Sequence, residues 1–153
     1  MAEKTTLGLP GKSSSYGQVG QAGASTGHIV GQTGKSVPVR VEGLNRIVAI
    51  AAGLKHSLAL RGDGTLWAWG YNNGQLGNGG SDSRNGPAQV TGLSGVNRIE
   101  VSCNHNLALV GNKVKAWGFN ATGQIDDNST INRHTPVDTQ GIWTGRVSQA
   151  AVG

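Results

Sequence analysis

The sequence is poor in the residues that mark several common protein classes. It has a single cysteine, Cys103, which excludes an intrachain disulfide framework. No window approaches the roughly 18 apolar residues of a membrane-spanning helix. The N-terminus, MAEKTTLGLPGKSSS, lacks the apolar core of a secretory signal. These absences favour a cytoplasmic protein, if the sequence begins at its natural start.

Glycine is the residue that the sequence has in excess, with 26 of 153 residues. Apolar runs lie between the glycines, so the composition is not that of a disordered chain. Many short strands joined by glycine turns fit this distribution better than helices do. The length corresponds to one domain.

A unit of about 49 residues repeats along the chain. The stretch Asp63–Gly77 (DGTLWAWGYNNGQLG) returns as Asn112–Asp126 (NKVKAWGFNATGQID). Three prolines, Pro38, Pro87 and Pro136, keep the step, since 87 − 38 = 49 and 136 − 87 = 49. The two copies differ by a hairpin turn that is one residue shorter and a following turn that is one residue longer. Compensated changes of this kind are expected where strands stack and turns lie in solvent.

Each repeat predicts about four short antiparallel strands and no helix. Asp63-Gly64 predicts a tight hairpin turn, and Ile47–Ala52 is an apolar run typical of a strand buried on both faces. The polar stretch Asn78–Gly86 predicts a loop, after which Pro87 begins the next cycle. The strands expected in the first full repeat are Pro38–Gly43, Ile47–Ala52, Ser57–Leu60 and Thr65–Trp69.

The repeat predicts an all-β fold made of β-propeller-type blades, because a four-stranded unit of this size must stack on copies of itself. Residues 38–153 form the predicted repeat domain, with about 2.5 repeats. Residues 1–37 form a Gly/Ser/Gln-rich arm. Within it, Gly17–Gly20 (GQVG) resembles Gly74–Gly77 (GQLG), so a degenerate repeat is expected from Tyr16.

The repeat resembles that of the regulator of chromosome condensation family. The resemblance implies a closed propeller of about seven blades. It also implies several roles: the founding member is a nucleotide-exchange factor for a small nuclear GTPase and contacts chromatin, and others are inhibitors, ubiquitin-ligase modules or scaffolds. The second copy departs at Asn112-Lys113, in place of Asp-Gly, and at Ile125-Asp126, in place of Leu-Gly. The matching repeat-defining residues are Gly53, His56, Asp63, Gly64, Trp69, Gly70, Gly74, Gln75, His105, Trp117, Gly118, Gly123 and Gln124.

The number of repeats is small for a closed propeller. From Tyr16 to Gly153 there are 138 residues, or 138/49, about 2.8 periods, whereas known propellers have about 4 to 8 blades. Unpaired end blades would expose sheet faces and edges. The chain is therefore predicted to be part of a longer protein or an incomplete propeller completed by oligomerisation, which makes copies of itself a candidate partner.

No catalytic, cofactor-binding or metal-binding residue is predicted. The Gly8–Ser13 and Gly31–Ser36 pieces lack the spacing of a phosphate-binding loop. His56 and His105 occupy equivalent positions and are interpreted as structural, each bonding its own turn. Cys103, expected on a strand two residues before His105, would give only two ligands on one face.

Two further groups have a predicted surface role. Asp126-Asp127 is interpreted as a solvated acidic pair in a loop. Trp143 follows Gly141 where the other copies have Asn45 and Ser94, so it is a candidate partner-contact residue.

The charge of the chain leaves a second class of partner open. Basic residues outnumber acidic ones, 13 to 8, for a net charge of +5. They are scattered, whereas a nucleic-acid binder usually concentrates them on one stripe. The predicted function is therefore a non-catalytic protein-binding or assembly module without a membrane or cofactor partner. The alternatives are a guanine-nucleotide exchange factor-like regulator of a small GTPase and a polyanion- or chromatin-binding module.

Overall fold

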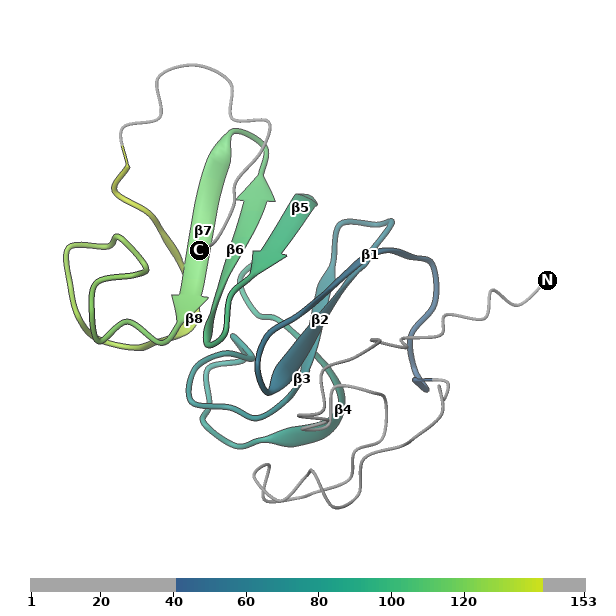
Figure 1. The fold of residues 1–153 in the computed structure, drawn as a ribbon. Helices are drawn as coiled ribbons and strands as arrows, with labels where there is room; N and C mark the ends of the chain where they lie inside the picture. The colour runs from purple at the N-terminus through teal and green to yellow at the C-terminus, as the bar shows by residue number, and fades with distance from the viewer. Residues whose placement is uncertain (1–40, 142–153) are drawn as a thin grey trace.

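The computed structural model describes residues 41–141, which form two four-stranded antiparallel sheets (Figure 1). The strand order is β1-β2-β3-β4 in the first sheet and β5-β6-β7-β8 in the second. The predicted all-β, propeller-type repeat is confirmed. The strands are β1 (Ile47–Ala52), β2 (His56–Arg61), β3 (Leu66–Gly70), β4 (Arg84–Gln89), β5 (Val96–Val101), β6 (His105–Val110), β7 (Lys113–Gly118) and β8 (Arg133–Asp138).

The central hairpin of each sheet forms where the turn residues predict it. In the first, Asp63 Oδ1 accepts hydrogen bonds from the backbone N and the hydroxyl of Thr65, at 2.9 and 2.6 Å. Both bonds hold the turn and lower the pKa of Asp63. In the second, Val110 pairs directly with Lys113, which confirms the shorter turn.

The two sheets share one apolar core. Side chains alternate across each strand, so Leu58 and Leu60 of β2 face the second sheet while Ala59 faces away from it. The second sheet contributes Ile99 and Trp117 to the shared core. The inner strand β5 packs against β1 and β2, so the sheets lie side by side as neighbouring blades (Figure 1). This contact buries the face that a single sheet would leave exposed to water.

The inner strand β1 has the predicted bounds, but the prediction that both of its faces are buried is wrong. Val48 and Ile50 are 65% and 43% exposed. They alternate with Ala49 and Ala51, which pack against the shared core. An apolar run alone does not distinguish a strand covered on both faces from one covered on one face.

The proline-containing strand also differs from its prediction. Strand β4 begins at Arg84, within the predicted loop Asn78–Gly86, and pairs with β3. Pro87 therefore lies inside the outer strand of the first blade and does not begin the second blade. An outer strand tolerates proline because one of its edges needs no hydrogen-bonding partner. Val41 to Gly43, the described part of the predicted strand Pro38–Gly43, is not strand.

Some predictions concern residues outside 41–141. They are the arm 1–37 with its degenerate repeat, and the candidate partner-contact residue Trp143. Within the described range no helix is long and apolar enough to cross a bilayer.

Candidate functional site

A buried polar group lies between the two sheets. His56, the first residue of β2, is 1% exposed. Its Nε2 lies 2.7 Å from Asn106 Oδ1 in β6 of the neighbouring sheet. The His56 side chain bonds the next blade, and its backbone O accepts a bond from Gly53 N of its own turn at 2.9 Å. The matching residue His105 is only half-buried.

Burial keeps both histidines neutral near pH 7. Desolvation is the main cause that lowers the pKa of His56 to about 4; the hydrogen bond to Asn106 raises it, and the nearby His105 lowers it further. Desolvation also lowers the pKa of His105. A neutral His56 donates from Nε2 to the Asn106 carbonyl oxygen. With a pKa of about 4, His56 does not titrate in the range that a general base near neutral pH requires.

The backbone carbonyl of Gln75 completes this group. It accepts hydrogen bonds from Asn106 Nδ2 at 2.9 Å and from the indole Nε1 of Trp117 at 3.0 Å. Three predicted repeat-defining residues, His56, Gln75 and Trp117, are therefore brought together by Asn106, which is fully buried. We call these four residues the interblade latch.

Asn106 was not identified from the sequence. The matching position of the first sheet is Ser57, so the two copies differ there. A polar residue at that position, directly after the repeat histidine, is the signal that could have indicated a bond between blades.

The remaining repeat-defining residues shape the turns of their own blades. Gly70 and Gly118 end β3 and β7 with φ of 111° and 109°. A Cβ at these positions would lie 2.4 Å from Lys55 O and 2.6 Å from Asn104 O, so only glycine allows the close approach. The other residues lie in turns and at strand starts: Gly53, Asp63, Gly64, Gly74, His105, Gly123 and Gln124.

Each blade carries one long loop held by a buried asparagine. Asn72 Oδ1 accepts bonds from the backbone N of Gly74 and Leu76, at 3.0 and 3.1 Å. Its amide donates to Gly80 O at 3.0 Å. In the second blade Asn120 has the same role and donates to Ser129 O at 3.0 Å. The loops are thus fixed parts of the blades.

The second loop also holds an ion pair. Asp127 bonds Arg133, and its side chain is only 5% exposed. Desolvation opposes ionisation of Asp127, but bonds from Ser129, Arg133 and Asn120 outweigh it and lower the pKa. The prediction of a solvated Asp126-Asp127 pair is therefore wrong for Asp127. Asp126 is exposed and has a positive φ of 55°.

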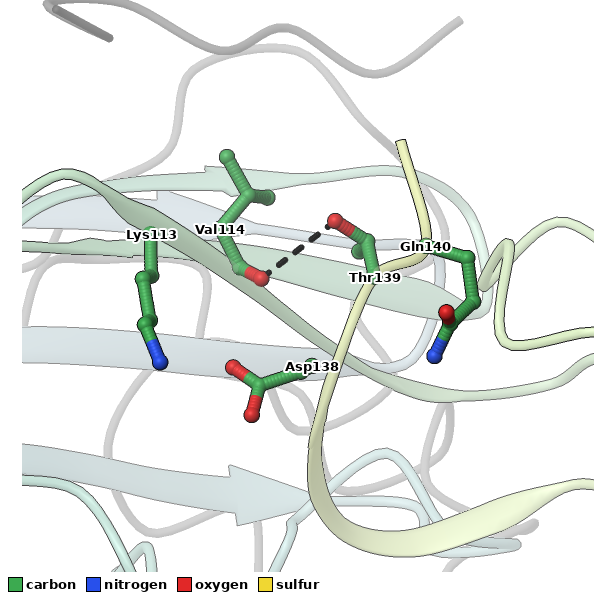
Figure 2. A pocket seen from close by; sticks show the side chains of 5 residues that line it. All are labelled: Lys113, Val114, Asp138, Thr139 and Gln140. Atoms are coloured by element: carbon green, nitrogen blue, oxygen red, sulfur yellow. Dashed lines mark hydrogen bonds between the residues drawn. The ribbon is translucent and has the colours of Figure 1, made fainter. Parts of the chain in front are cut away.

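A small pocket lies at the outer end of β7 and β8 (Figure 2). It measures about 290 Å³ and is lined by Lys113, Val114, Asp138, Thr139 and Gln140. Thr139 donates from its backbone N to Val114 O at 3.2 Å, and Lys115 pairs with Asp138 at 2.9 Å. The pocket is therefore a recess of mixed polar and apolar lining, and one of its residues, Asp138, is in an ion pair. Among its lining residues there is no histidine or cysteine that could form a nucleophile–base pair.

Cys103 is exposed and lies between β5 and β6, so it is not on a strand as predicted. Its backbone O accepts a bond from Leu54 N at 3.0 Å, which ties the corresponding turns of the two blades together. Within residues 41–141 no group of three His, Cys, Asp or Glu residues could hold a metal ion.

The surface with the clearest capacity for binding is the face of the first blade that points away from the second. Ile50 pairs with Ala59, which pairs with Trp67, so these three lie in one row. Ile99 holds the same position in the second blade and is 7% exposed because the first blade covers it, whereas Ile50 is 43% exposed. We call the face that carries Val48, Ile50 and Trp67 the open face. Sequence reasoning missed its exposure.

One basic residue belongs to the open face. The guanidinium of Arg61 lies over the Trp67 ring, with its Cζ 4.2 Å from the ring centroid, and its Nη2 donates to Gly43 O at 2.7 Å. The face is therefore apolar with one fixed cation at its rim, a composition typical of protein-contact surfaces.

The comparisons with known proteins agree with this geometry. The chain matches the "Regulator of chromosome condensation (RCC1) repeat" over residues 11–60 and 63–110. A second description of the same repeat matches residues 47–75.

Solved structures show the same fold. The crystal structure of human WBSCR16 is 25% identical with a TM-score of 0.71, over 91% of this chain and 36% of that one. Prp20p from Saccharomyces cerevisiae, described with its binding properties to Gsp1p and histones, is 20% identical with a TM-score of 0.62, over 69% and 28%. Yeast RCC1 (Prp20) bound to Kap60 is 19% identical with a TM-score of 0.66, over 81% and 32%. This chain thus spans roughly a third of the length of these structures.

Proposed function

Because the chain belongs to the regulator of chromosome condensation repeat family, we propose that it is a non-catalytic propeller-blade module that binds proteins and assembles through its open face. The repeat defines the blade and is shared by members with different roles, so function has to be argued from a surface.

The observation that carries this proposal is the difference between Ile50 and Ile99. They are the same residue type at the same position of the repeat, yet Ile99 is covered by a neighbouring sheet and Ile50 is not. A sheet face with this pattern gains free energy when another apolar surface removes it from water. The relatives support a protein as the covering partner, since Prp20p is described with Gsp1p, histones and Kap60.

The first partner that we propose is a second copy of the chain. Light scattering at several concentrations should give a mass above the 15.7 kDa of one chain. Ile50→Lys places a charge on the open face and should return the mass to that of one chain, because burying an unpaired cation opposes association. Ile131→Lys is the matched control, since Ile131 is 64% exposed and lies in the loop before β8. A folded monomer at every concentration would contradict the proposal of self-assembly.

A second candidate function is guanine-nucleotide exchange, supported by the binding of Gsp1p that is described for Prp20p. A panel of small GTPases loaded with fluorescent GDP tests it. Exchange activity predicts faster GDP release in the presence of the chain, and unchanged release across the panel would remove this candidate.

A further inference from the structure

The two described sheets have four edge strands, and three of these carry residues that discourage pairing with another chain. The edges are β1 and β4 in the first sheet and β5 and β8 in the second. An edge strand presents unpaired backbone groups, which proteins protect with charged residues and proline. Strand β5 carries Arg98 and Glu100, and prolines lie within both outer strands, Pro87 in β4 and Pro136 in β8.

Both prolines remove a backbone N–H that would point away from its sheet. The backbone N of Val90 donates to β3, and that of Thr139 donates to β7. Because alternate residues of an antiparallel strand bond the same neighbour, Pro87 and Pro136 occupy positions that face outward. The outer edges of both blades therefore lack a donor that an added strand would need.

Strand β1 has neither charge nor proline. Its sequence is IVAIAA, and it has Ala49 and Ala51 where the second blade has Arg98 and Glu100. A bulge between Ile47 and Ala49 interrupts only the start of the strand. Uncharged apolar edge strands are the ones that template pairing with another chain. The edge of β1 is therefore the unprotected edge of the described blades.

The backbone of β1 is directed toward this edge at Ile50 and Ala52. Gly53, directly after the strand, donates its backbone N to His56 O of β2 at 2.9 Å. The alternation of an antiparallel ladder then points the N–H and C=O of Ile50 and Ala52 away from β2. Within residues 41–141 no strand pairs with β1 on that side. The strand thus presents backbone donors and acceptors to a strand added there.

We propose that a second copy of the chain pairs with this edge through its own β1, in the antiparallel direction. The inference rests on the proposed self-assembly and specifies its geometry. A copy offers β1 as its unprotected edge, so the same surface serves on both sides of the contact. Such an isologous contact closes as a pair and does not propagate into a filament.

The register follows from the direction of the backbone groups. Outward-facing residues pair with outward-facing residues, and the alignment that does so over most of β1 places Ile50 opposite Ile50 of the second copy. Ala52 then lies opposite Val48 of the second copy, so a small residue meets a larger one. The two Ile50 side chains, each 43% exposed in the single chain, become cross-strand neighbours on the open face. Edge pairing thus removes part of this apolar surface from water.

Removal of one outward-facing N–H tests the pairing. Ala52→Pro keeps the ladder between β1 and β2, because the Ala52 N–H points away from β2, and it leaves the side chains of Val48 and Ile50 in place. Light scattering should show an association that is weaker than that of the wild type by about tenfold or more. Ala52→Val keeps the N–H and introduces the residue that the second blade has there, Val101, so it should associate as the wild type does. The free energy of unfolding checks that both variants are folded.

Cysteine cross-links test the register in a Cys103→Ser background. The Cα atoms of a hydrogen-bonded antiparallel pair lie about 5.5 Å apart, a separation that a disulfide spans. Ile50→Cys should therefore form a covalent dimer in the presence of glutathione disulfide, as should a mixture of Val48→Cys and Ala52→Cys. Ile131→Cys is the control for chance collisions, since Ile131 is 64% exposed and lies in a loop.

The outcomes separate edge pairing from the proposed function. Association that survives Ala52→Pro would overturn the edge pairing and leave assembly through the open face in place. Cross-linking of Ile50→Cys that is no faster than that of Ile131→Cys would have the same meaning. A wild type that is monomeric at every concentration would contradict self-assembly itself, and the edge pairing with it.

Discussion

At the scale of single residues, the junction between the blades depends on groups that are fully desolvated and fully paired. His56, Asn106 and Trp117 each find their partner on the other blade, at sequence separations of up to 50 residues. In the interior such bonds hold one arrangement of the sheets, because any other leaves a buried polar group unpaired. The pKa of His56 follows from the same desolvation.

The pH dependence of stability should report on His56. Its pKa is about 4 when folded and 6.5 ordinarily, so below pH 6.5 the unfolded chain binds a proton that the native chain does not. The native state therefore loses stability as the pH falls from 6.5 towards 4, by about 2 kcal/mol between pH 7 and pH 5. Urea unfolding at both pH values measures it. His56→Gln should lose most of this difference, and an unchanged pH dependence in that variant would contradict the assignment.

At the scale of the elements, the turn after β3 packs the first blade against the second. In this turn, Gly77 has a φ of 62° and lies directly against Trp117 and Val90 of the shared core. Gly92, in the turn before β5, has a similar φ of 71°, but a side chain there would meet nothing within 4 Å. Both positions disfavour L side chains, and only one of them is also packed.

Substitutions at Gly92 and Gly77 separate the stability cost of backbone strain from that of packing. Gly92→Ala should cost about 1–2 kcal/mol, the penalty of left-handed backbone. Gly77→Ala should cost about 1–3 kcal/mol more, because its Cβ overpacks the core. The free energies of unfolding of the two variants give the difference directly. Equal losses would show that the latch turn is not packed against Trp117 in solution.

At the scale of the whole molecule, the two described blades share one interface. Their facing sides form one apolar cluster, to which the first blade gives Leu58 and Leu60 and the second gives Ile99 and Trp117. Repeat proteins owe much of their stability to such nearest-neighbour interfaces. A substitution that destabilises the interface should therefore destabilise both blades.

Leu58→Ala tests this coupling. Leu58 is fully buried, so the cavity should cost about 2–5 kcal/mol. Hydrogen exchange should show weaker protection in β6 as well as in β2, whereas Val48→Ala, at an exposed position of the same blade, should leave both unchanged. Loss of protection confined to β2 would indicate that the blades unfold independently.

The repeat, its hairpins and its blade character could be predicted from the sequence because they depend on neighbouring residues. Asp63-Gly64 closes a turn and the alternation through Trp69 makes a strand whatever lies elsewhere in the chain. The glycine after each of Trp69 and Trp117 was also recognised as part of the repeat. Its positive φ became visible only in the structure.

What covers each face was decided only by the tertiary structure. Ile50 and Ile99 occupy the same position of one repeat, yet one is exposed and the other is buried, because alternation defines two faces without saying what lies on them. Pro87 was assigned to the start of a cycle and closes the preceding blade, since pairing is a property of two strands. Asn106, the partner of the His56 side chain, was not identified from the sequence, because a buried donor takes the acceptor that folding places beside it, however distant in sequence.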